Sequence, residues 1–167
     1  RALDPTDLAA ISTTNISKLT TAQIGALTTD QVAALSGLQL EKLTAEQRLK
    51  LTAEQIAAIE TQDLAALSTA TIQGLASAQA AALTAEQLQV LTTAQIRALD
   101  SQDVAALTSA QIVALSSEQI FALGTAQFAA LGSAQIAALE TEDITALGTA
   151  TIAGLSTAQV AGLTDAQ

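Results

Sequence analysis

Apolar residues recur along this chain with a period of eight. From Leu3 onward, every eighth position holds leucine, and only Ile11 and Ile59 differ among 21 such positions. A second apolar site follows five residues after each of these, and only Arg48 and Ala80 interrupt it among 20 members. An unbroken period without insertion or deletion identifies a strict repeat. We call the unit an octad and number its positions from the leucine, so that the apolar sites are positions 1 and 6.

A period of eight predicts a chain that turns once in every octad. On a continuous α-helix, eight residues advance by about 800°, so an apolar stripe would wind around the helix. Coiled coils need periods of seven or eleven, and a half-buried strand needs strict alternation. The octad therefore predicts an all-α solenoid with one very short helix per 8-residue repeat and about 20 repeats. We expect residues 1–167 to form a single solenoid, a fragment of a longer array.

The helix starts are marked at position 2 of the octad, where a capping residue recurs. Thr52–Gln55 and Thr92–Gln95 fit the capping box, in which the hydroxyl accepts from the third helical N–H and glutamine reaches back to the cap N–H. About six residues remain between caps, too few for a helix that is stable alone in water. Such helices form only when stacked on copies of themselves. Position 2 is also filled by the carboxylate of Asp100 and by glycine, which is tolerated at a cap, at Gly124, Gly132 and Gly148.

A longer period lies over the octads. Acid pairs recur at every fifth octad, at Glu60 and Asp63, Asp100 and Asp103, and Glu140 and Asp143, and a Thr-Ile-x-Gly segment that starts at residue 71 recurs at residue 151. This indicates duplication of larger blocks. We interpret five octads as two superhelical coils of roughly 20 residues each, which gives about eight coils and a rod of roughly 70–80 Å at ordinary helix-packing distances.

Composition removes several functions. Half of the residues are apolar, 1% are aromatic, and there is no His, Cys, Met, Trp or Tyr. Imidazole and thiolate catalysis, Cys/His zinc sites and disulfides are therefore excluded. We expect no enzyme, no catalytic residue, no cofactor site and no metal site. The net charge of −10, of which −7 lies in residues 84–167, opposes nucleic-acid binding, and no uncharged run is apolar enough to predict membrane insertion.

Four surface features are candidate sites, each with a simpler structural interpretation. The acid pairs at 60/63, 100/103 and 140/143 could hold a hard cation if they shared one face, but their cap positions already explain them. The position-5 glutamines, such as Gln23, Gln31, Gln127, Gln135 and Gln159, could bind a ligand, but capping is sufficient. A row of hydroxyls at Thr125, Ser133, Thr141, Thr149 and Thr157 could bind ice or carry glycans, or it is an ordinary solvated face. Phe121 and Phe128 are interpreted as local core or groove fillers.

Residues 38–51 depart most from the pattern. They gather Lys42, Arg48 and Lys50 among acids, and Arg48 takes an apolar site while Leu49 moves in beside it. A local protein contact is one interpretation. A shift of register with surface ion pairs is the favoured one.

Units such as LTTAQIGA, LTAEQIAA, LTSAQIVA and LSTAQVAG resemble octads of very large bacterial secreted or surface proteins, which carry adhesion or haem-utilisation labels. The resemblance covers essentially the whole chain and implies a bacterial extracellular or cell-surface location. No iron ligand of the usual types supports a haem role. We predict a structural segment, a spacer, stalk or filament unit that associates end to end; the alternative is a recognition module that binds a peptide or a glycan, such as a cell-surface partner.

Overall fold

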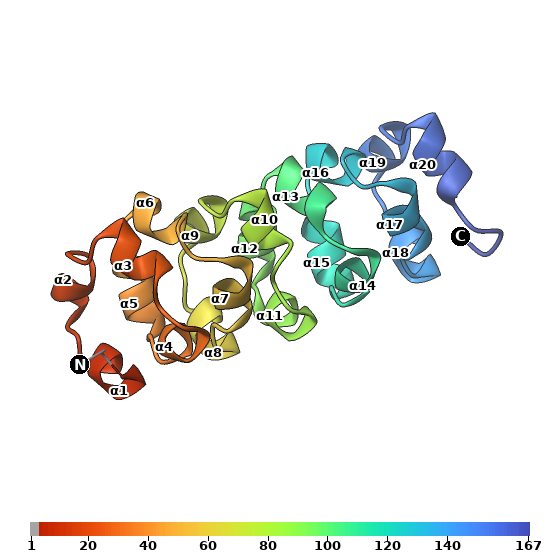
Figure 1. The fold of residues 1–167 in the computed structure, drawn as a ribbon. Coiled ribbons are helices and arrows are strands. Elements are labelled where there is room, and N and C mark those ends of the chain that lie inside the picture. The colour runs from red at the N-terminus through yellow and green to blue at the C-terminus, as the bar shows by residue number, and fades with distance from the viewer. Residues whose placement is uncertain (1–3) are drawn as a thin grey trace.

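The structure is a computed structural model that describes residues 4–167, and those residues form helices joined by short connections, with no strand among them. Figure 1 shows the helices following one another around a rod, with the N- and C-termini at opposite ends. The predicted all-α solenoid with one short helix per octad is confirmed.

Twenty helices of four to six residues lie in residues 4–167. The first ten are α1 (Pro5–Ala9), α2 (Thr13–Ile16), α3 (Thr21–Gly25), α4 (Thr29–Ala33), α5 (Gly37–Lys42), α6 (Ala45–Arg48), α7 (Ala53–Ala57), α8 (Thr61–Ala65), α9 (Thr69–Gln73) and α10 (Ser77–Ala80). The second ten are α11 (Ala85–Val90), α12 (Thr93–Ala98), α13 (Ser101–Ala106), α14 (Ser109–Val113), α15 (Ser117–Ala122), α16 (Thr125–Ala129), α17 (Ser133–Ala137), α18 (Thr141–Thr145), α19 (Thr149–Ala153) and α20 (Thr157–Gly162).

Each helix begins and ends for local reasons. At the junction before α6, Leu43 (φ −62°, ψ 140°) and Thr44 (φ −67°, ψ 162°) are both extended, which turns the chain out of one helix and into the next. The Thr44 hydroxyl then accepts from the Gln47 N–H, as the capping box predicts. At the other end, the N–H of the position-1 leucine donates to the position-6 carbonyl three residues earlier, as from Leu115 to Ile112 at 3.1 Å. The helix therefore stops after little more than one turn.

Three octads make one coil. Close packing between helices joins each one to the third before it and the third after it, as α10 packs on α7 and on α13, and the step from α6 to α9 is the loosest of these. The chain therefore makes about seven coils. Our interpretation of five octads as two coils is wrong, because the five-octad period records sequence duplication and not the superhelical turn.

Positions 1 and 6 form the core, as the pattern predicts. Position-6 side chains such as Ile24 and Val104 are fully buried, and position-1 leucines such as Leu83 and Leu99 are at most 3% exposed. The next coil covers position 6, because position 6 is fully buried in the first coil and exposed at Ile152 and Val160 in the last. Position 1 is only partly buried in both end coils, at Ile11, Leu19 and Leu27 and at Leu147, Leu155 and Leu163. Among the described helices, none is long and apolar enough to cross a membrane.

Candidate functional site

The position-5 glutamines join neighbouring coils as well as capping helices. In α15, the Gln119 backbone N–H donates to the Ser116 hydroxyl and the Gln119 Oε1 accepts from the Ser116 N–H at 2.9 Å, which completes the predicted capping box. The Gln119 Nε2 then donates to the carbonyls of Leu88 at 2.8 Å and Leu91 at 2.7 Å, which belong to the preceding coil. One buried amide therefore satisfies polar groups of two coils.

This second bond recurs with constant register. With both partners within residues 4–167, twelve glutamines place Nε2 2.5–2.9 Å from the position-1 carbonyl 28 residues earlier: Gln39, Gln47, Gln55, Gln79, Gln87, Gln95, Gln111, Gln119, Gln127, Gln135, Gln159 and Gln167. We call this series the glutamine ladder. Capping was predicted, but this bridge was missed. The sequence holds one signal for it, because glutamate caps a helix as well as glutamine does, and only glutamine also donates a hydrogen bond.

The three acid pairs do not lie on one face. Asp63 is in α8, which packs between α5 and α11; Asp103 is in α13, between α10 and α16; Asp143 is in α18, against α15. These helices belong to three different stacks around the rod, because five octads are not a whole number of coils. Consistently, no group of three carboxylates gathers within residues 4–167. The shared face on which a cation site depended is absent.

Asp63 reverses the polarity of the bridge. Its Oδ1 accepts from the Gly37 N–H at 2.6 Å, so it caps the start of α5 in the preceding coil instead of donating to a carbonyl. The approach is close, because a Cβ on Gly37 would lie 2.8 Å from the Asp63 carbonyl oxygen. Glycine at residue 37 therefore lets a side chain shorter than glutamine reach the neighbouring coil.

Asp103 and Asp143 lack this close approach to a glycine. The residues at the position of Gly37, relative to these two aspartates, are serines, Ser77 and Ser117. Both aspartates are at most 4% exposed, and within residues 4–167 no donor is bound to Oδ1 of either. Burial raises the pKa of Asp103 above its ordinary value, although hydrogen bonds from the Asp100 N–H and the Ser77 hydroxyl oppose this, and the Asp100 carboxylate adds a smaller increase. These buried carboxylates are local defects of the ladder.

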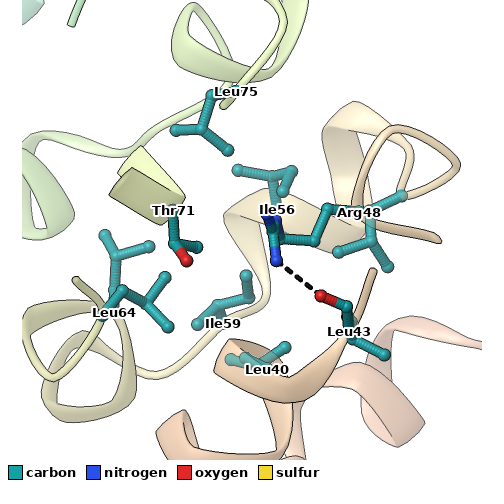
Figure 2. Close-up of a pocket in the computed structure, with 10 residues that line it drawn as sticks. Leu40, Leu43, Arg48, Ile56, Ile59, Leu64, Thr71 and Leu75 are labelled. Atoms are coloured by element: carbon teal, nitrogen blue, oxygen red, sulfur yellow. Dashed lines mark hydrogen bonds between the residues drawn. The ribbon is translucent and has the colours of Figure 1, made fainter. Parts of the chain in front are cut away.

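At Thr71 the ladder is replaced by an arginine. Threonine is too short to bridge coils. In the register of the ladder, a glutamine at residue 71 would donate to the Leu43 carbonyl. Arg48 reaches it instead: Figure 2 shows its guanidinium in the interior, where Nη1 donates to the Leu43 carbonyl at 2.5 Å. A cavity of about 20 Å³ remains beside Arg48 and Thr71, room for about one water molecule.

Glu41 completes this polar group. It accepts from the Ser68 hydroxyl at 2.6 Å and from the Ser68 N–H at 3.1 Å. Although burial opposes ionisation, these bonds and the charge of Arg48 hold the pKa of Glu41 below its ordinary value. We call Glu41, Leu43, Arg48, Ser68 and Thr71 the first seam. Helices α5 and α6 keep the octad register here, so Arg48 is a substitute donor within residues 38–51 and not a sign of shifted register.

The same positions ten octads later are occupied by Phe121, Leu123, Phe128, Gly148 and Thr151, which we call the second seam. Phe128 is a core filler at 1% exposure, as interpreted, whereas Phe121 is 46% exposed. All five residues line a cavity of about 60 Å³. No donor reaches the Leu123 carbonyl from the described part of the chain.

The position-3 hydroxyls do not make one row. Thr125, Ser133, Thr149 and Thr157 are exposed and Thr141 is half-buried, but they start the successive helices α16 to α20, which are distributed around the rod. Only every third hydroxyl shares a stack. A surface of regularly spaced, adjacent hydroxyls is therefore not formed by these five residues.

Capped helices, a three-octad coil and the glutamine ladder define the protein as an octad-repeat α-solenoid. The model of the ALTTAQ repeat family matches residues 1–37, 56–93, 86–117, 112–141 and 136–167, and the chain belongs to this family. The matched segments leave out residues 38–55, which contain Arg48. No curated protein matches the chain.

Proposed function

We propose that the chain is a structural segment, a rigid spacer, stalk or filament unit, of a bacterial extracellular or cell-surface protein. The observation that supports this most is the glutamine ladder, which extends at least from Gln39 to Gln167. Such a ladder ties each coil to its neighbour and stiffens the whole length. The two cavities described, of about 20 and 60 Å³, are far below the size of a substrate pocket.

The two end coils present complementary surfaces. In the first coil, the position-1 residues Ile11, Leu19 and Leu27 are only partly buried, although position 6 is fully buried there. In the last coil, the position-6 residues Ile152 and Val160 are 45% and 53% exposed. Each surface matches the interior face of the other, whether further octads or a second copy supplies it. Such heterologous contacts propagate head to tail and do not close into a dimer.

Light scattering and electron microscopy of the 167-residue polypeptide across a concentration series test this proposal. We expect thin filaments that lengthen with concentration. Ile152→Glu with Val160→Glu should stop growth by placing charge on an end surface, whereas Val113→Glu, at a 53% exposed site on α14 away from both end coils, should not. A symmetric dimer that stops growing, or equal effects of both changes, would contradict end-to-end association.

The proposed location has its own test. Antibodies raised against the solenoid should label intact cells of the source bacterium. Labelling that requires permeabilised cells would contradict a surface or extracellular role.

A further inference from the structure

The second seam leaves a hydrogen-bond acceptor of the ladder unserved beside two aromatic rings. Its cavity lies between α15–α16 and α18–α19, and Phe121, Leu123, Phe128 and Thr151 are among its lining residues. Phe121 is 46% exposed and brings the cavity to the surface, whereas Phe128 is 1% exposed. The cavity is therefore reached from solvent, and the ring that a ligand can contact is that of Phe121.

The register of the repeat identifies what this place accepts. In the register of the ladder, the position-5 residue Thr151 corresponds to the Leu123 carbonyl. At twelve other places the equivalent position-1 carbonyl accepts a hydrogen bond from a glutamine Nε2. In the first seam it takes the Nη1 of Arg48. In the second seam Phe128 stands in the place of Arg48 and supplies no donor. At the equivalent carbonyls of the ladder and of the first seam, the fold supplies a side-chain N–H as the donor.

We propose that this cavity binds the guanidinium group of an arginine side chain carried by a partner protein. One edge of the group donates to the Leu123 carbonyl, as Arg48 does to Leu43 in the first seam. Its flat face stacks against the exposed phenyl ring of Phe121 by cation–π attraction. Gly148 leaves the approach open, since nothing lies within 4 Å of the position its Cβ would take.

Charge and hydration favour guanidinium over the other donors. Residues 84–167 carry a net charge of −7, which attracts a cation and not a neutral amide. An ammonium is a compact and strongly hydrated charge, whereas a guanidinium is planar, weakly hydrated and able to donate while it stacks. The site should therefore rank arginine above lysine and glutamine.

The test is an NMR titration of the isotope-labelled chain with N-acetylarginine amide, and with the lysine and glutamine analogues as matched probes. We expect saturable shifts of the amide signals of Leu123, Gly148 and Thr151 for the arginine probe, with affinity at least several-fold weaker for the other two. Phe121→Ala should weaken binding of the arginine probe about three-fold by removing the exposed ring.

Thr151→Gln is the decisive variant, because its Nε2 is expected to take the Leu123 carbonyl as glutamine does elsewhere in the ladder. This variant should fold with an unchanged far-ultraviolet spectrum and lose the saturable shifts. Equal shifts in the variant, no saturable shift in the original chain, or equal affinity for all three probes would overturn the proposal. Such failure would leave the proposed structural role untouched, because end-to-end association is measured separately.

Discussion

The first and second seams occupy equivalent positions ten octads apart, and both have threonine in place of the bridging glutamine. In the first, Arg48 donates to the Leu43 carbonyl and Glu41 accepts from Ser68, so these polar groups are paired within an interior that is otherwise lined by leucine and isoleucine. In the second, Phe121 and Phe128 take the places of Glu41 and Arg48, and no donor among the described residues reaches the Leu123 carbonyl. The cavity there is about three times as large, at 60 against 20 Å³.

This difference shows which part of the repeat is kept in both seams, namely the filled core at position 6. The apolar volume at position 6 can be supplied by an arginine stem or by a phenyl ring. The donor to the position-1 carbonyl can come from position 5 of the next coil or from position 6 of the same octad. Where neither residue supplies a donor, the junction keeps its core and loses its hydrogen bond.

The largest expected effect is at Phe128. Phe128→Ala should lower the free energy of unfolding by about 3–5 kcal/mol, because it removes a fully buried ring and leaves a cavity. Phe121→Ala is the matched control and should cost less than about 1 kcal/mol, since the ring is half exposed. Urea unfolding measures both. Similar losses at the two sites would mean that the second seam is not built around Phe128.

The next largest effects are changes in the free energy of unfolding that a double-mutant cycle of Arg48 and Thr71 measures in the first seam. Arg48→Leu should cost about 1–3 kcal/mol by leaving the buried Leu43 carbonyl without a donor, and Thr71→Gln added to it should restore most of the loss. Thr71→Gln alone should bring no gain, because Arg48 already serves the carbonyl. The same substitution in the second seam, Thr151→Gln, should stabilise by about 1 kcal/mol. Equal effects of Thr71→Gln and Thr151→Gln would contradict the interpretation that Arg48 replaces a position-5 glutamine as the donor to the Leu43 carbonyl.

How much of this could be predicted depends on the range of each interaction. The short helices followed from local signals, such as Thr52 and Gln55 in one capping box. The size of the coil did not, because a period of eight requires each octad to return to the interior and leaves open how many octads complete a turn. The bonds of Gln119 to Leu91 and of Arg48 to Leu43 depend on the packing of coils, so they were found only in the structure.

Asp103→Gln should stabilise the protein by about 1–2 kcal/mol. It replaces a buried carboxylate, one oxygen of which has no partner, with an amide that can donate to the Leu75 carbonyl, its partner in the register of the ladder. Asp63→Gln is the matched control and should destabilise, because a glutamine in the register of the ladder directs its oxygen to its own cap N–H and leaves the Gly37 N–H without the carboxylate that accepts from it. Thermal and urea unfolding would show the two opposite signs. Stabilisation by both changes would mean that aspartate at position 5 is unfavourable in both octads and that the bond between Asp63 and the Gly37 N–H does not stabilise the fold.

The smallest effect is on pH dependence. Because burial raises the pKa of Asp103, its contribution to stability is full below the unfolded pKa of about 3.8 and is lost as pH rises through the higher folded value. The pKa of Glu54 and of Glu86 is lowered by hydrogen bonds at their helix starts, so these groups contribute the opposite slope. Asp103→Asn should therefore lose stability more steeply on acidification than the original chain. Parallel curves from pH 7 to pH 3 would contradict this.

The most direct measurement of the glutamine ladder is the scalar coupling across its hydrogen bonds. NMR of the deuterated chain should show a cross peak between the side-chain nitrogen of Gln119 and the carbonyl carbon of Leu91, with slow exchange of the side-chain amide protons. Gln23, which caps its own helix and has no coil before it in this polypeptide, is the internal control and should show neither. The absence of the Gln119 coupling, together with amide exchange as fast as at Gln23, would show that glutamine only caps helices and that the coils are held by apolar packing alone.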